Sequence, residues 1–102
     1  MFEKAVAKNP GFLTARNNLA AILMEKNDYT GAILNYSEVL ASGPADFALL
    51  FNLGLAYARI GEFYRAESLW KQAYTLNPQD SDIQDALQYV RTKLDAANKA
   101  RR

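Results

Sequence analysis

Apolar residues recur at helical spacing along most of this chain, in segments that end at helix-breaking residues. One segment runs from Asp46 to Ile60 and another from Phe63 to Leu76, and Gly61 separates them. Glycine lacks a Cβ and adopts left-handed backbone angles without a clash, so it commonly ends a helix. We therefore expect two helices joined by a tight turn. The buried face expected for the first of them comprises Leu49, Leu50, Leu53, Ala56, Tyr57 and Ile60.

The same arrangement occurs in the first half of the chain, at a constant offset of 34 residues. There Asn27 takes the place of Gly61, and Asn also enters the left-handed region at low cost. A segment from Tyr29 to Ala41 follows, and Pro44 and Pro78 close the two copies because the residue before a proline disfavours helical angles. Other pairs in register are Leu19 with Leu53, Ala20 with Gly54, Leu23 with Tyr57, Tyr29 with Phe63, Ala32 with Ala66, and Tyr36 with Trp70. A helix-turn-helix unit is therefore used twice.

The residues at fixed places in each copy resemble the tetratricopeptide repeat, a helical repeat of about 34 residues. The second copy follows the pattern closely, as Leu50-x-x-Leu53-Gly54-x-x-Tyr57, then Ala66-x-x-x-Trp70 and Pro78. The first copy is looser, because Arg16 stands where the family prefers a bulky apolar residue, and one contact should be loosened. The resemblance implies an all-α fold, a right-handed helical solenoid. In it, Gly54 and Ala66 mark the closest approach of paired helices, and Trp70 fills the gap to the next repeat.

The repeat register divides the chain into four segments. Complete repeats are expected at residues 13–46 and 47–80. Residues 1–12 are interpreted as the tail of a truncated preceding repeat, since Phe2 falls at the repeat position of a core aromatic residue. Residues 81–102 are expected to form a capping helix and a basic tail, which would end the array. The apolar face of this cap comprises Ile83, Leu87, Val90 and Leu94, and its polar outer side Gln84, Gln88 and Arg91.

Composition narrows the chemistry that such a fold can carry. The chain has 12 Lys and Arg against 11 Asp and Glu, so no excess charge attracts nucleic acid or an anionic membrane. Neither Cys nor His is present, which removes the usual zinc ligands and the thiol and imidazole nucleophiles. No apolar run approaches the ~20 residues that span a bilayer. We expect no enzymatic activity, no metal or other cofactor, no nucleic-acid partner and no membrane span.

The first helix of each repeat should line a concave groove, as the resemblance implies. Asn18 and Asn52 share one repeat position there, and each amide can both donate to and accept from a peptide backbone. Phe51, Leu55 and Tyr89 add apolar contact beside Asn52. The alternative is that these two Asn residues are simply tolerated as exposed polar residues. The full candidate set is Asn17, Asn18, Glu25, Phe51, Asn52, Leu55, Arg59, Tyr89 and Lys93.

Charged residues along this groove allow more than one interpretation. Glu25, Arg59 and Lys93 recur at one repeat position, where they either set a charge preference or belong to a solvated face. Asp82 and Asp85 also project into the groove, although acidic residues near a helix start have a sufficient structural cause. Asp82 stands where the chaperone-tail carboxylate clamp of some tetratricopeptide proteins needs a basic residue. We therefore do not expect the groove to act as a chaperone-tail carboxylate clamp.

The leading functional hypothesis is a non-catalytic interaction module that binds a peptide or a partner-protein segment in this groove. The rival is a structural or oligomerisation segment of a longer array. It would stack on another repeat, or self-associate with another copy, through an N-terminal edge formed by Phe2, Ala5 and Val6. The sequence identifies neither the partner nor the compartment.

Overall fold

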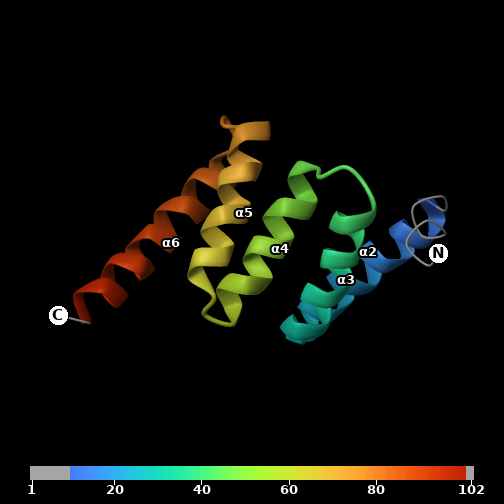
Figure 1. Cartoon of the computed structure of the whole chain (residues 1–102), viewed down its shortest axis with the longest axis horizontal. Helices are drawn as coiled ribbons and strands as arrows, with labels where there is room; N and C mark the ends of the chain where they lie inside the picture. Colours follow the sequence, from blue (N-terminus) through green and yellow to red (C-terminus); the bar gives the residue numbers. More distant parts are fainter. Residues whose placement is uncertain (1–9, 101–102) are drawn as a thin grey trace. The chain divides into compact units, whose positions relative to one another are not determined.

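The computed structural model describes residues 10–100, which form five α-helices and, within that range, no strand. Two compact units divide the chain between Ala45 and Asp46, and each is described by itself. The residues interpreted as a half-helix, residues 2–9, lie outside the described part. The chain is all-α, as predicted, and its helices follow one another as hairpins (Figure 1).

The first unit is a hairpin of α2 (Pro10–Glu25) and α3 (Tyr29–Ser42), which pack against each other. Asn27, in the turn, has φ 63°, so the predicted left-handed turn residue is confirmed. Asp28 then caps α3, because its side chain accepts a hydrogen bond from the amide of Gly31 at 3.1 Å. Small residues let the helices approach closely, and Ala20 and Ala32 are both fully buried.

Arg16 forms a polar link between these two helices. Its Nη1 donates to Oδ1 of Asn35 at 2.9 Å, and Nδ2 of Asn35 donates to the Gly31 carbonyl, also at 2.9 Å. The guanidinium group also lies 5.1 Å from the centre of the Phe12 ring. The apolar contact that the repeat pattern prefers at this position is thus replaced by an inter-helix hydrogen bond.

The second unit contains α4 (Phe47–Arg59), α5 (Phe63–Leu76) and α6 (Ser81–Ala100). α4 packs on α5 and α5 on α6, and the short connections make successive helices antiparallel (Figure 1). α4 and α6 therefore run in the same direction. Gly61, between α4 and α5, has φ 83°, and a Cβ there would meet nothing within 4 Å. The backbone angle, rather than lack of space, is the reason for glycine at this turn.

The core of the second unit follows the repeat pattern with two exceptions, Tyr57 and Ile60. Tyr57 was expected on the buried face of α4 but is only partly buried. The predicted apolar face of α6 is confirmed, and the buried apolar side chains are Leu49, Leu50, Leu53, Ala56, Ala58, Ala66, Leu69, Trp70, Ala73, Ile83, Leu87, Val90 and Leu94. The prediction for Ile60 was wrong, because this side chain is 46% exposed. α4 ends at Arg59, and Ile60 is its C-cap, where the backbone has already left the helical path. A cap residue does not continue the buried face.

Gly54 provides the close approach that places Trp70. A Cβ on Gly54 would lie 2.5 Å from Nε1 and 2.6 Å from Cδ1 of the Trp70 indole. The indole therefore occupies the space that a larger residue on α4 would need. The Trp70 indole fits against α4 only because Gly54 has no side chain.

One apolar face remains open on α2. Leu19 and Ile22 are 46% and 47% exposed, whereas Leu87 and Val90, at the same repeat positions in α6, are 8% and 0% exposed. α6 buries this face against α5. Among the described residues of the first unit, no helix covers the equivalent face of α2.

Candidate functional site: a pocket in the second unit

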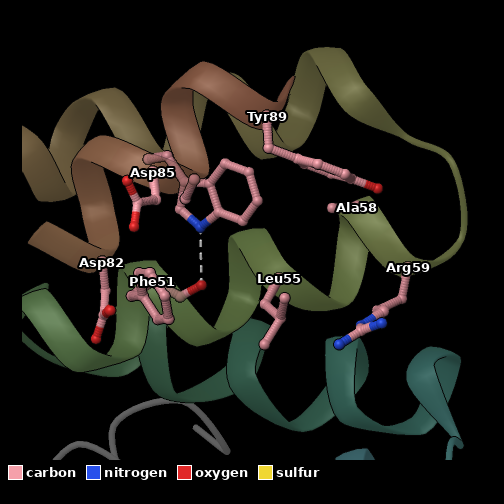
Figure 2. Close-up of a pocket in the computed structure, with 9 residues that line it drawn as sticks. Phe51, Leu55, Ala58, Arg59, Asp82, Asp85 and Tyr89 are labelled. Carbon is pink, nitrogen blue, oxygen red and sulfur yellow. Dashed lines mark hydrogen bonds between the residues drawn. The ribbon is translucent and has the colours of Figure 1, made fainter. Parts of the chain in front are cut away.

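A pocket of about 510 Å³ opens in the second unit, within the size range of ligand sites. α4 forms one side and α6 the other, and Trp70 contributes from α5. Six of the nine lining side chains are apolar or aromatic, and the other three are charged. The lining residues are Phe51, Leu55, Ala58, Arg59, Trp70, Asp82, Asp85, Ala86 and Tyr89 (Figure 2).

Helical spacing explains why these side chains meet. Phe51, Leu55 and Arg59 stand four residues apart on α4 and therefore lie along one face of that helix. Asp85 and Tyr89 have the same spacing on α6, and both stand 34 residues after a pocket residue of α4. Because α4 and α6 run in the same direction, the repeat places equivalent positions opposite each other across the pocket.

Trp70 connects the pocket lining to the core. Its side chain is only 2% exposed, and its Nε1 donates to the Phe51 carbonyl at 2.9 Å, which is the dashed line in Figure 2. The two rings are also in contact, with centroids 6.2 Å apart. A buried indole that is both packed and hydrogen-bonded has one defined orientation. It therefore makes a rigid part of the pocket wall.

Neighbouring rings orient the aromatic residues at the opening. Phe51 stacks on Phe47 at 6.1 Å, and Tyr89 meets Phe63 edge to face at 6.4 Å between ring centroids. Lys93 Nζ lies 5.6 Å from the centre of the Tyr89 ring. Tyr89 is nevertheless 47% exposed, so it presents apolar surface that a ligand can cover.

The charged side chains of the pocket are free to meet a ligand. The N-terminus of α6 is capped by Asp80, whose Oδ1 accepts from the amide of Ile83 at 3.0 Å. Asp82 and Asp85 are therefore not needed as caps. Within residues 10–100, neither carboxylate forms a hydrogen bond or an ion pair, and the same holds for the exposed Arg59 guanidinium.

The pocket brings together some of the candidate residues from the sequence. Phe51, Leu55, Arg59 and Tyr89 line it, and Lys93 adjoins it through Tyr89. Other candidates lie elsewhere: Asn52 is half-buried on α4 outside the lining, and Asn17, Asn18 and Glu25 lie on α2 in the first unit.

Sequence reasoning missed Ala58 and Trp70 as lining residues. Trp70 was assigned wholly to packing, yet it contributes to the core and to the pocket at once. Its position 34 residues after the core residue Tyr36 indicated burial but not a second role.

A second hollow, of about 560 Å³, lies along α5 and α6. Six of its eight lining side chains are polar or charged, namely Lys71, Gln84, Gln88, Arg91, Thr92 and Asp95, and the others are Tyr74 and Leu87. Such a surface is well hydrated and offers little apolar area to a ligand. The pocket between α4 and α6 is the better-formed candidate site.

The described residues offer no support for two other kinds of site. Within residues 10–100, no three His, Cys, Asp or Glu side chains gather as a metal site would require. No helix in that range combines the length and hydropathy of a membrane span.

These features define a helical repeat protein with a solvent-open, mainly apolar pocket. Residues 20–61 match the family described as TPR repeat, and residues 47–80 match the family described as Tetratricopeptide repeat. The chain belongs to the tetratricopeptide repeat family. Repeats of this family generally mediate protein–protein interactions and are typically non-catalytic. No curated protein matches the chain significantly.

Proposed function

We propose that the pocket between α4 and α6 binds an apolar side chain from an extended segment of a partner protein. The observation that carries this proposal is the apolar lining around Leu55 and the half-exposed Tyr89, backed by an immobilised Trp70. Covering one Leu-sized side chain contributes about 1.5–3 kcal/mol. A micromolar Kd requires about 8 kcal/mol, so a single anchor of this size supports only weak binding, with a Kd in roughly the millimolar range.

Asn52 is proposed to hold the backbone of the same segment. It follows Phe51 on α4 and is half-buried, so part of its side chain is open to a ligand next to a lining residue. A side-chain amide can both accept and donate hydrogen bonds, as a peptide group does. It can therefore bind the backbone of a peptide whatever the peptide's side chains are. One such hydrogen bond contributes about 0.5–1.5 kcal/mol.

The test is a selection of binders on the immobilised full chain from a random peptide library, followed by titration of variants. Leu55→Glu places a charge in the pocket centre and is expected to weaken selected peptides at least about tenfold, since burying a charge without a partner is costly. Asn52→Ala is expected to weaken them about threefold. Leu76→Glu is the matched control, because Leu76 is exposed on α5 outside the pocket. Equal affinities for all three variants and the wild type would show that peptides bind elsewhere.

A second candidate role is structural, and the open face of α2 favours it. In α6 the equivalent face is covered by α5, so the repeat arrangement leaves a place for another helix on this face of α2. We propose that a repeat of a second copy of the chain packs on Leu19 and Ile22 and so extends the repeat stack.

This structural role predicts that Leu19→Glu lowers the free energy of unfolding by about 1–2 kcal/mol more than Leu34→Glu, since a covered Leu contributes more than an exposed one. Leu34 is exposed on α3 and serves as the control. Chemical unfolding and sedimentation measure both variants. Equal costs with unchanged sedimentation contradict the proposal. The expected sedimentation result is a wild-type dimer that Leu19→Glu dissociates and Leu34→Glu does not.

A further inference from the structure

The pocket between α4 and α6 has opposite charges at its two ends. Asp82 and Asp85 lie at one end beside Phe51, and Arg59 lies at the other end beyond Leu55 (Figure 2). We call these the acidic end and the basic end. Lys93, the residue of α6 equivalent to Arg59, lies on the ring of Tyr89 and adds a second positive charge toward the basic end.

The helix termini do not cancel this polarity. The N-terminus of α6 contributes about half a positive charge near the acidic end, and the C-terminus of α4 about half a negative charge near Arg59. Two carboxylates outweigh the first contribution, and two cations outweigh the second. Glu62, the other acidic residue where α4 gives way to α5, already faces Arg65 at 3.9 Å. The net field therefore runs along the pocket from negative to positive.

The spacing of the ends sets the length of a matching ligand. Phe51 and Arg59 are separated by eight residues of α4, or about 12 Å at a rise of about 1.5 Å per residue. An extended peptide rises about 3.3 Å per residue, so about four residues cover that distance. Side chains two residues apart in an extended chain point the same way. Residues i, i+2 and i+4 of such a peptide can all face the pocket.

We infer that the pocket selects an extended protein segment in which a basic and an acidic residue flank an apolar one, each two positions away. The basic side chain lies over Asp82 and Asp85, the apolar one enters beside Leu55 and Tyr89, and the acidic one meets Arg59. This inference rests on the proposed function, because it specifies which segment the same pocket takes. Charge complementarity along the pocket supplies the selectivity, and apolar burial supplies most of the affinity.

Capped peptides of the form Gly-Lys-Ser-Leu-Ser-Glu-Gly test this directly. Two companion peptides carry Lys at both charged positions or Glu at both, and a third replaces the central Leu with Ser. Trp70 is the only tryptophan in the chain and lines the pocket, so its fluorescence reports occupancy. We expect the Lys–Leu–Glu peptide to bind about three- to tenfold more tightly than either like-charged peptide at about 0.15 M salt. At about 1 M salt this difference should largely disappear.

A charge reversal in the protein gives the complementary result. In Arg59→Glu, the new carboxylate and the negative C-terminus of α4 together outweigh Lys93, so this variant should prefer the peptide with two Lys residues over the Lys–Leu–Glu peptide. Arg91→Glu is the matched control, because it changes the net charge equally from an exposed site outside the pocket and should leave the preference unchanged.

The outcomes separate this inference from the proposed function. Equal affinity of the three charged peptides, with loss only when Leu is replaced, overturns the charge selection and leaves an apolar pocket in place. A preference inverted equally by Arg91→Glu also overturns it, since net charge then suffices. If none of the peptides changes Trp70 fluorescence at millimolar concentration, both the selection and the proposed function are wrong.

Discussion

Replacing Val90 with Asp is expected to detach α6 from α5 and to lower the free energy of unfolding by at least about 3 kcal/mol. Val90 is fully buried at the centre of the face that α6 packs on α5. Burying an unpaired carboxylate there costs more free energy than the packing of α6 on α5 provides. The helix should therefore undock. A free helix of this length is only marginally stable in water, and most of its helicity should disappear as well.

Far-UV circular dichroism and the emission of Trp70 measure this effect. Undocking of α6 should reduce the helical signal and shift Trp70 emission to the red, since α6 lines the pocket opposite the indole. Gln88→Asp makes the same charge change at an exposed position two residues earlier and should alter stability by no more than about 0.5 kcal/mol. A Val90→Asp variant as stable as Gln88→Asp would show that α6 is not held by this face.

Trp70→Ala is expected to cost about 3–5 kcal/mol, the range for removing a large aromatic side chain from a packed core. The indole is 2% exposed, packs against Gly54 and donates its hydrogen bond to the Phe51 carbonyl. Its loss leaves a cavity, removes the second hydrogen bond that the Phe51 carbonyl accepts, and removes the pocket wall. Chemical unfolding followed by circular dichroism gives the stability, since the variant has no tryptophan signal.

A double-mutant cycle with Gly54 tests the same arrangement from the opposite side. In the wild type, Gly54→Ala forces its Cβ against the indole and should cost about 1–3 kcal/mol. In the Trp70→Ala background the obstacle is gone, and the better helix propensity of Ala should stabilise α4 by about 0.5–1 kcal/mol. The effect of Gly54→Ala on the free energy of unfolding thus changes sign between the two backgrounds. Additive effects would contradict the assignment of Gly54 to the Trp70 contact.

Periodicity made most of the fold predictable, because buried faces and turn residues both repeat. The left-handed angles of Asn27 and Gly61, the segment that became α5, and the apolar face of α6 all follow from residue type and spacing. Ile60 was misassigned because spacing alone does not show where a helix ends. The residue has the right interval for the buried face but lies just beyond the last helical turn of α4.

The site was predictable only in part, because its geometry depends on packing between helices. Helical projection identified Phe51, Leu55, Arg59 and Tyr89, which share one face of their helices. It could not show that Asp80 alone caps α6 and leaves Asp82 and Asp85 free. Nor could it show that the indole of Trp70 reaches the pocket from a third helix, since that depends on its close approach to Gly54.

Binding of a partner segment between α4 and α6 can be located by amide chemical-shift mapping. A ¹⁵N-labelled chain is titrated with the Lys–Leu–Glu peptide or a library-selected binder. We expect the largest shifts on the amides around Phe51, Leu55, Ala86 and Tyr89 and on the Trp70 indole N–H. Shifts confined to the polar hollow around Gln88 and Thr92, or to the first unit, would contradict binding between α4 and α6.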